Sequence, residues 1–470
     1  MKRFPQLLLL LMPFFAISQT RLQFHQPVKQ RVFVLTDITN EPDDQESLVR
    51  FLVYANEYDI EGIVATTSTH LRNMTRRDKI EQLVKDYGKV KPNLDKHAAG
   101  FPSMEYLLGV TTTHLPAFGM DGVGDGKDSP GSELLIKAVD KADDRPLWIS
   151  VWGGANCLAQ ALWKVKKTRS SADLEKFVAK LRVYAISDQD FSGPWIRHTF
   201  PGILFIVDPS AGDSWKEYYR ATWTGIGGDH WYKNGPKYAF DLVDNPWLKE
   251  NVRENHGPLG ANYLPLEYIM EGDTPSFFGL IQNGLAWYHS PAWGGWGGRY
   301  EHFKAYGEKA KIWTSTVTTQ DEVTLPDGRV FASNQATIWR YRKEYQHDFA
   351  ARMDWNIADT YAKANHNPVV VLNGNKGKSW AKGQVPAGEK VSLSAKGSSD
   401  PDGDQIRYHW WVYREAGNFS GSLDIFNPQG ESIEFVMPHL REGQELHILL
   451  QVEDSGSPSL TSYRRVVLGN

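Results

Sequence analysis

A repeated order of apolar run, amphipathic segment and apolar run constrains the fold of this 470-residue chain more than any other feature. Residues 31–36 are typical of a buried strand, residues 44–58 repeat apolar side chains at helical spacing, and residues 60–67 return as a strand. Two strands joined by a helical crossover run parallel in one sheet. The opening of the chain therefore predicts a βαβ unit and a parallel sheet.

The same order recurs further along the chain. The later strand and helix candidates are residues 147–152 (strand), 156–166 (helix), 181–186 (strand) and 203–207 (strand). Repeated alternation of this kind is typical of α/β domains with helices on both faces of the sheet. We predict an open, mostly parallel α/β domain over residues 28–364.

After His366 the pattern changes to short alternating runs separated by Gly, Pro and Asp turns. This predicts an all-β, immunoglobulin-like sandwich over residues 368–470. Each region has its own apolar periodicity, so we expect the first to fold without the second. Within the sandwich, Asp400, Asp402 and Asp404 are spaced as calcium ligands, although a tight turn rich in Asp and Gly needs no metal.

The N-terminal residues predict the compartment. A basic start is followed by an apolar stretch from Leu7 to Ile17, which is short for a membrane span, and by small residues suited to cleavage. We predict a signal peptide over residues 1–18, no later membrane span, and a secreted or periplasmic protein. The single cysteine, Cys157, excludes an intramolecular disulfide framework and a cysteine-rich zinc site.

Charge and composition limit the classes of binding partner that we expect. A formal net charge of −4 and a pI near 6.4 give no basic footprint, so we expect no nucleic-acid partner. The 17 Trp residues are numerous, and flat aromatic faces bind the apolar faces of sugars, although most of these rings belong in the core. The oligomeric state stays open at this stage.

Acidic residues follow the first predicted strand. Asp37, Asp43 and Asp44 come where the strand ends and a helix begins. Ligand sites of open α/β sheets lie beyond the carboxyl ends of the strands, so this cluster indicates a metal or sugar site. The alternative is a helix N-terminus, with Pro42 in the first turn and both aspartates facing the helix dipole.

Further candidate side chains lie later in the chain. Asp188 and Asp190 also follow a strand, and Glu271 and Asp273 lie in a turn, where Asp273 is equally suited to cap a helix. Trp293 and Trp296 lie in a Gly-rich loop that suits either a sugar-stacking platform or a packing plug. We include Asp188, Glu271, Asp273 and both Trp residues among the predicted carbohydrate-binding residues.

Four segments resemble the nucleoside hydrolase superfamily, in the family's order. They are residues 35–48 (strand, acidic loop, helix), 151–159 (VWGGANCLA), 205–209 (FIVDP) and 256–260 (HGPLG). The resemblance implies a calcium ion held by Asp37, Asp44 and the backbone carbonyl of Ala155, with Asn156 beside the sugar.

The sequence differs from the superfamily motifs at several positions, and these differences bear on the expected function. Five residues separate Asp37 from Asp43 where the superfamily has three, Gly202 to Leu204 replace its usual Glu and Asn, and Gly257 replaces an Asp that completes the calcium shell. A plain nucleosidase is thus disfavoured. The whole arrangement looks closest to secreted bacterial cellulose-binding proteins with a nucleoside-hydrolase-like domain, which implies a carbohydrate partner.

The leading hypothesis is a calcium-dependent glycosidase that cleaves an O- or N-glycosidic bond with inversion, using metal-activated water. Asp37 would be the base, Asp43 would hold vicinal sugar hydroxyls, and His256 would protonate the leaving group, unless it only makes a structural hydrogen bond. The alternatives are a non-catalytic polysaccharide-binding protein on the same fold and a nucleoside hydrolase.

Overall fold

The computed structural model describes residues 21–39, 41–209 and 215–470. The predicted signal peptide lies outside these ranges. Within them, none of the helices combines the length and the apolar character that a bilayer crossing requires.

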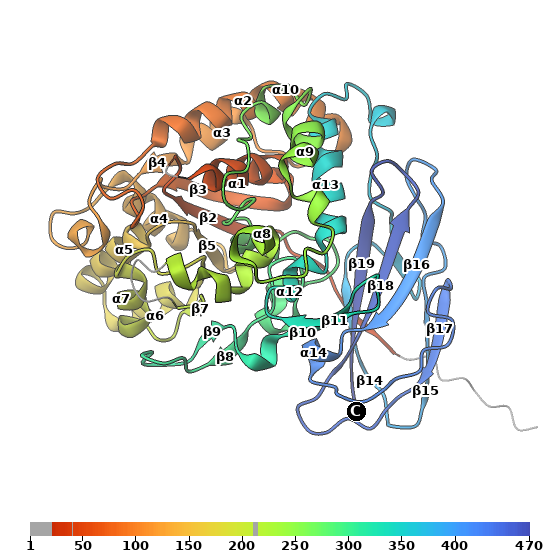
Figure 1. The fold of residues 1–470 in the computed structure, drawn as a ribbon. Coiled ribbons are helices and arrows are strands. Elements are labelled where there is room, and N and C mark those ends of the chain that lie inside the picture. Colours follow the sequence, from red (N-terminus) through yellow and green to blue (C-terminus); the bar gives the residue numbers. More distant parts are fainter. Residues whose placement is uncertain (1–20, 40, 210–214) are drawn as a thin grey trace, which may run out of the picture.

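An eight-stranded sheet forms the centre of the first region, in the order β4-β3-β2-β5-β6-β7-β9-β8 (Figure 1). All neighbouring strands are parallel except β8, which pairs antiparallel with β9 at one edge. This confirms the predicted α/β fold. The strands are β2 (Gln30–Thr36), β3 (Tyr58–Ala65), β4 (Thr111–Thr113), β5 (Leu147–Val151), β6 (Leu181–Ala185), β7 (Leu204–Ile206), β8 (Glu301–Phe303) and β9 (Ile312–Thr314).

Helices cover both faces of this sheet, and β2 shows why its sequence is apolar throughout. Val32 and Val34 pack in one core with α1 and α2, whereas Phe33 and Leu35 pack in a second core with α4 and α5. A strand buried on both faces reads as a continuous apolar run. The helices of this region are α1 (Pro42–Val53), α2 (Arg77–His97), α3 (Met104–Gly109), α4 (Pro130–Asp140), α5 (Asn156–Thr168), α6 (Ser171–Ala179), α7 (Ser192–Thr199), α8 (Asp229–Tyr232), α9 (Asn245–Leu248), α10 (Gly257–Gly260), α11 (Pro275–Phe278), α12 (Ala336–Trp339) and α13 (Arg342–Trp355).

A separate strand-rich region follows, as the alternating pattern predicted. Its main sheet has the order β1-β14-β19-β18-β16, and the pair β15-β17 packs in the same core. Strand β1 comes from the N-terminal end of the described chain and pairs antiparallel with β14. The elements are β1 (Gln23–His25), β12 (Val371–Leu372), β13 (Asn375–Lys376), β14 (Trp380–Gln384), β15 (Lys390–Ser394), β16 (Ile406–Val412), α14 (Arg414–Gly417), β17 (Ser432–Val436), β18 (Leu446–Asp454) and β19 (Thr461–Gly469); a separate hairpin, β10 (Asp321–Thr324) and β11 (Val330–Ser333), precedes them.

The two regions share a buried interface. Arg465 on β19 has no exposed surface and donates hydrogen bonds to the carbonyl oxygens of Leu285 (2.8 Å), Trp293 (2.9 Å) and Gly294 (3.0 Å). A Cβ atom on Gly284 would lie 1.8 Å from the carbonyl oxygen of Tyr463, so the backbones meet directly. This contact argues against independent folding of the first region, because its loss leaves several buried carbonyl groups unpaired.

Hydrogen bonds already occupy the Asp-rich turn of the second region. Asp400 accepts from the backbone amides of Asp402 (2.8 Å) and Asp404 (3.1 Å). Asp402 accepts from the ring of His366 at 3.0 Å, next to the junction of the two regions. The other oxygen of Asp400, Oδ2, is buried without a hydrogen-bond partner among the described residues, so both alternatives for this turn stay open.

Candidate active site

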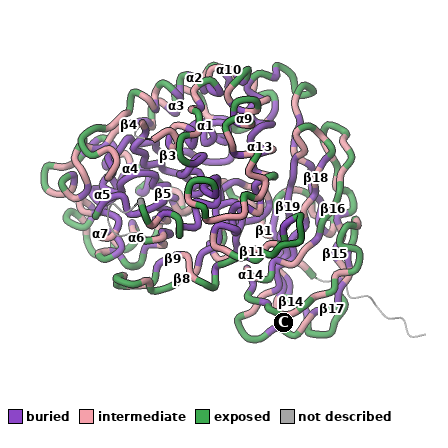
Figure 2. Tube along the Cα trace, in the orientation of Figure 1, coloured by how far each residue is buried: buried purple, intermediate pink, exposed green. Residues whose placement is uncertain are grey.

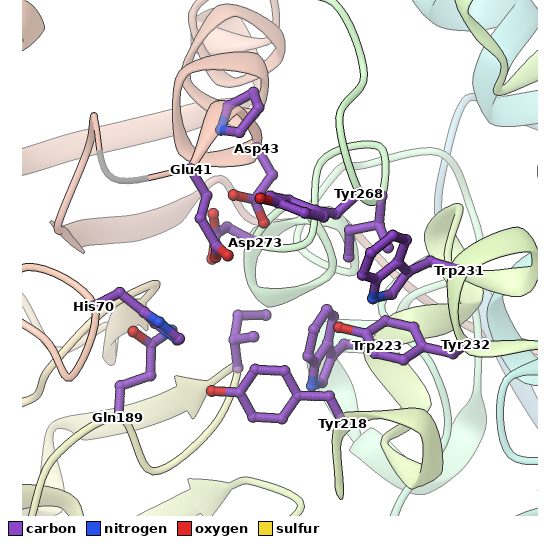
Figure 3. A pocket seen from close by; sticks show the side chains of 13 residues that line it. Glu41, Asp43, His70, Gln189, Tyr218, Trp223, Trp231, Tyr232, Tyr268 and Asp273 are labelled. Carbon is purple, nitrogen blue, oxygen red and sulfur yellow. The ribbon is translucent and has the colours of Figure 1, made fainter. Parts of the chain in front are cut away.

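A pocket of about 290 Å³ lies beyond the carboxyl ends of the central strands (Figure 3). Strand β2 has β3 on one side and β5 on the other, so the chain order reverses there, and such switch points are where open α/β sheets bind ligands. The volume is at the lower end for small-ligand pockets. The pocket is lined by Glu41, Pro42, Asp43, His70, Ile186, Gln189, Tyr218, Trp223, Trp231, Tyr232, Tyr268, Ile269 and Asp273.

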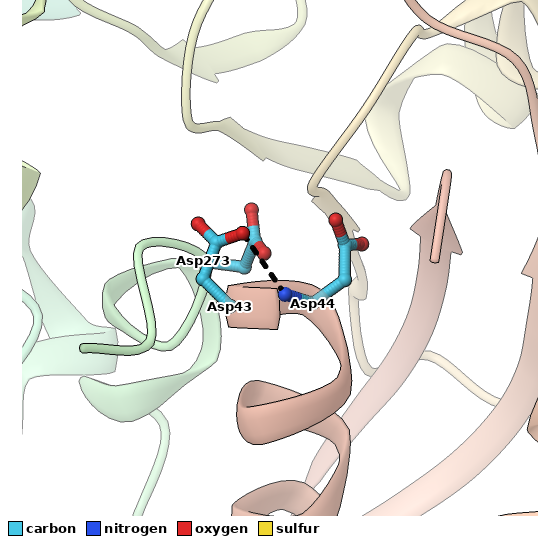
Figure 4. Close-up of side chains that lie close together, drawn as sticks. All are labelled: Asp43, Asp44 and Asp273. Carbon is cyan, nitrogen blue, oxygen red and sulfur yellow. Dashed lines mark hydrogen bonds between the residues drawn. The ribbon is translucent and has the colours of Figure 1, made fainter. Parts of the chain in front are cut away.

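Three carboxyl groups lie close together at this pocket (Figure 4); Asp43 and Asp273 line it, and Asp44 lies beside them. Asp43 and Asp44 belong to the first turn of α1, and Asp273 comes from the loop before α11. One carboxylate oxygen from each lies within 4.8 Å of the others. Asp44 accepts a hydrogen bond from Thr36 Oγ1, and Asp43 accepts one from the amide of Asp44 at 3.2 Å. The arrangement offers oxygen ligands to a single ion.

Asp37 adds a fourth carboxylate next to this group. Its Oδ2 accepts a hydrogen bond from Ser68 Oγ, whereas its buried Oδ1 has no hydrogen-bond partner among the described residues. A Cβ atom on Gly153 would lie 2.3 Å from Oδ1, so the glycine after β5 allows the close approach. Asp273 Oδ2 is likewise buried and without such a partner.

Raised pKa values show that ionisation of these four carboxylates is unfavourable. Burial, reinforced by Glu41 and Asp37, raises the pKa of Asp43 from 3.8 to about 8. Burial and neighbouring carboxylates also raise the pKa of Asp44 and of Asp273 well above the ordinary value, and burial raises that of Asp37. None of these four carboxylates forms an ion pair in the part of the chain that the structure describes. A bound cation would relieve this repulsion, so the residues fit a metal site.

Aromatic side chains build the opposite wall of the pocket (Figure 3). Trp231 and Tyr268 stand at its rim, are 47% and 42% exposed, and meet edge to face with ring centroids 5.0 Å apart. Trp223 and Tyr218 lie deeper. These rings were not predicted because Trp231, Trp223 and Tyr218 lie in helical segments of four to six residues, which are too short to show a periodic pattern in the sequence.

His70 and Gln189 also line the pocket and were not predicted. His70 reaches in from the side opposite the aromatic rings (Figure 3), and its Nε2 atom is buried without a hydrogen-bond partner among the described residues. Both residues follow strands, β3 and β6, that end at the same edge as β2. The strand-end rule that singled out Asp37 could have found them.

Of the two acidic residues in the loop before α11, only Asp273 lines the pocket. Glu271, predicted as a carbohydrate ligand, is completely buried in an ion pair with Arg50 and accepts hydrogen bonds from Tyr263 (2.6 Å) and Thr274 (2.9 Å). Its carboxylate is fully engaged in holding the loop against α1. That prediction was wrong, because the sequence does not reveal a pairing partner 221 residues away.

The carboxylate of Asp188 is held in a buried ion pair and is not free to bind a ligand. Both its oxygens accept from Arg197, at 2.7 and 2.9 Å, and Arg197 in turn contacts Glu308. Its predicted role in sugar binding is therefore wrong, since the bidentate pair occupies the carboxylate. Asp190, by contrast, keeps one buried oxygen unpaired, and burial raises its pKa to about 6.

His256 does not line the pocket. Its Nε2 lies 3.2 Å from Asp354 on α13, where the ring has the structural hydrogen bond considered as the alternative to a catalytic role. The segment 256–260 therefore does not supply the acid of the site. Asp273, followed by Thr-Pro, is the third carboxylate of the group formed with Asp43 and Asp44.

The Trp residues of the Gly-rich loop are buried. Trp293 is 7% exposed and packs against Trp380 and His447 in the interface between the regions, and Trp296 is 1% exposed. The predicted stacking platform at Trp293 and Trp296 is thus wrong, and the packing alternative holds. Composition alone does not distinguish exposed from buried rings.

Ala155 and Asn156 begin α5 at the same edge of the sheet. Asn156 is fully buried and donates to Thr67 Oγ1 and to the carbonyl of Ala117, both at 2.9 Å, while its Oδ1 has no partner among the described residues. The carbonyl of Ala155 accepts from the Ala159 amide at 3.0 Å, which leaves one lone pair free. Their ligand roles stay predictions.

The comparisons with known proteins agree with this architecture. Residues 31–300 match the family described as "Cellulose-binding Sde182, nucleoside hydrolase-like domain". The chain belongs to this family. Residues 390–469 match the C-terminal domain of cellulose-binding protein Sde0182. The two matches fall in the two regions that the structure shows.

A solved structure resembles nearly the whole chain. It is a nucleoside hydrolase-related hypothetical protein from Saccharophagus degradans, described as associated with carbohydrate metabolism, with 38% identity and a TM-score of 0.80 over 94% of this chain and 100% of that one. The effector protein XOO4466 gives 10% identity and a TM-score of 0.28 over 61% of this chain and 87% of its own, which is too low to support any argument. No curated relative matches the chain.

Proposed function

We propose that this protein is a metal-dependent glycoside hydrolase that cleaves a glycosidic bond of a carbohydrate in the acidic pocket, with inversion at the anomeric carbon. The observation that carries the proposal is the grouping of the Asp43, Asp44 and Asp273 carboxylates, two of which line a pocket with aromatic walls. A small pocket suits one sugar unit at the end of a chain.

The proposed ligands of the metal are Asp43, Asp44 and Asp273, with Asp37 beside them. This replaces the sugar-binding role first predicted for Asp43. An oxygen-only ligand set suits a hard cation such as calcium. A cation there would stabilise the ionised carboxylates and make a nearby water molecule more acidic.

Asp37 is the proposed general base. Its Oδ1 faces no hydrogen-bond donor of the described residues, while Ser68 holds the other oxygen and fixes the carboxylate. Asp37 does not itself line the pocket, and its free oxygen would accept the proton of an attacking water held at the neighbouring carboxylates. Water that attacks opposite to the leaving group inverts the anomeric centre and needs no covalent intermediate.

His70 is the proposed general acid in place of His256. Its unpaired Nε2 faces into the pocket across from Asp273 (Figure 3), so a proton on that atom is positioned to pass to the departing oxygen or nitrogen. Trp223 and Ile269 border the same space and reduce access of bulk water. His70 thus supplies the acid, and Asp37 the base, of one inverting step.

The second candidate function is non-catalytic polysaccharide binding on the same fold. The family description, which names cellulose binding, favours it, and so do the exposed rings of Trp231 and Tyr268 at the rim. A nucleoside hydrolase is the third candidate. The family and its carbohydrate partner also support an extracellular location, which we propose together with the signal peptide.

The decisive experiment measures hydrolysis of a panel of aryl glycosides, cello-oligosaccharides and nucleosides, with calcium and with chelator. We expect turnover of glycosides that chelator abolishes and that Asp37→Asn lowers by about 10² to 10⁴-fold. Asp144→Asn, an exposed aspartate in the loop before β5, is the matched control. Absence of hydrolysis across the panel, together with retained polysaccharide binding, would instead establish the binding function.

A further inference from the structure

An open groove lies beside the acidic pocket, on the other side of the 3-10 helix Trp215–Arg220. Tyr218 of this helix lines the pocket, and its neighbour Tyr219 lines the groove. The groove has a volume of about 880 Å³, three times that of the pocket, and extends along the β8–β9 edge of the sheet. Along this edge β8 is mostly exposed, whereas β9 is mostly buried (Figure 2).

Large apolar side chains are exposed along the groove. Phe303 on β8 is 47% exposed, and Tyr306 in the turn after it is fully exposed, as is most of Val317. Neither Phe303 nor Tyr306 stacks on another ring of the described residues, and both keep exposed surface. Apolar side chains that are exposed together in one groove with a polar rim are typical of an interaction site.

The other side chains that line the groove are mostly uncharged. Asp208, at the base of the groove, is engaged by the amides of Thr222 (2.8 Å) and Ser315 (2.7 Å), and the other charged groups are one acid and one base, Glu217 and Arg220. Hydroxyl and amide side chains make up most of the rest. Free aromatic faces among neutral polar groups suit an uncharged sugar chain, whereas a nucleic acid requires a basic surface.

We propose that this groove is a second carbohydrate site, which holds a β-glucan chain on Phe303 and Tyr306 and is distinct from the acidic pocket. The choice of a glucan rests on the carbohydrate partner of the proposed function, but the groove needs no hydrolysis to bind. Its volume accommodates several sugar units, whereas the pocket accommodates about one. The groove would thus bind a polysaccharide chain whose end occupies the neighbouring acidic pocket.

The test compares binding of full-length protein to hydroxyethyl cellulose in affinity gels and to cellohexaose by calorimetry. Phe303→Ala and Tyr306→Ala together should weaken binding about 10-fold, and Tyr306→Ala alone about 3-fold, because each ring contributes one stacking contact. Phe426→Ala, which removes another exposed ring from the second region, should bind as wild type. All variants should melt as wild type, since each side chain is substantially exposed.

Hydrolysis of a short aryl glycoside separates this proposal from the proposed function. The groove variants should keep that activity, and Asp37→Asn should lose it while still binding the polymer. Unchanged polymer binding in the double variant, an equal loss in Phe426→Ala, or no binding by wild type would each overturn the groove proposal. The aryl glycoside assay would then still report on the pocket independently.

Discussion

Asp273→Asn provides the sharpest test of the metal site, because it removes one negative charge and preserves the shape of the side chain. Two opposite effects follow. The metal-free protein should become more stable, since repulsion among the pocket carboxylates falls. The stabilisation by metal should disappear, since one of the three converging ligands is lost.

The geometry gives the size of the first effect. Two like charges 4.8 Å apart, the largest separation between the grouped ligand atoms, repel by about 3 kcal/mol at an effective dielectric constant near 20. Because some of the carboxylates are protonated, the repulsion summed over all pairs is smaller than the number of pairs suggests. We therefore expect Asp273→Asn to raise the free energy of unfolding by about 3 kcal/mol at pH 8 without metal. For a chain of this size that corresponds to a melting temperature about 3 °C higher.

The pH dependence has a defined sign. The pKa of Asp43 is about 8 in the folded protein and 3.8 as the ordinary value, so the folded state favours the protonated group. The contribution of this group to the stability of the metal-free wild type should therefore be greatest below about pH 4 and be lost as the pH rises through 8. The advantage of Asp273→Asn should shrink toward pH 5, where the wild-type carboxylates are protonated.

Thermal melts in chelator and in calcium at pH 5 and pH 8 measure both effects. Calcium at 100 times its dissociation constant should stabilise wild type by about 2.7 kcal/mol, or about 3 °C, and the variant by less than 1 °C. Asp144→Asn controls for the change in net charge. Equal calcium stabilisation of wild type and Asp273→Asn, or a less stable variant in chelator at pH 8, would refute the reasoning.

Three further predictions follow from the contacts around the site. His70→Gln should lower single-turnover rates on an aryl glycoside by about 10²-fold, and His256→Gln by less than threefold; equal losses would return the acid role to His256. Glu271→Gln should lower the free energy of unfolding, measured in urea, by about 3 to 5 kcal/mol, because it weakens a buried ion pair with Arg50. The variant should bind as much metal as wild type. Loss of the ion would instead show that Glu271 belongs to the metal site. A fragment ending at residue 366 should not melt cooperatively in calorimetry, because it lacks the buried β19 contacts; a sharp melt near the wild-type temperature would show that the first region folds alone.

The local sequence was sufficient for the architecture. Residues 31–36 and 60–67 alternate with a helical segment, and this alone predicted a parallel sheet, which the structure confirms within a few residues at each boundary. The same pattern placed Asp37 and Asp43 at the ligand edge, since a strand end is visible in the sequence. The change in periodicity after His366 likewise predicted the strand-rich region, although not the contribution of β1 to its sheet.

Only the tertiary structure decided which acidic and aromatic side chains reach the pocket. Asp273 and Glu271 lie two residues apart in one turn, yet one lines the pocket and the other pairs with Arg50 on α1. Trp231 is exposed at the rim, whereas Trp296 is buried. Periodicity describes neighbours along the chain, but burial and ion pairing depend on contacts between segments more than 200 residues apart, which are fixed only when the helices pack on the sheet.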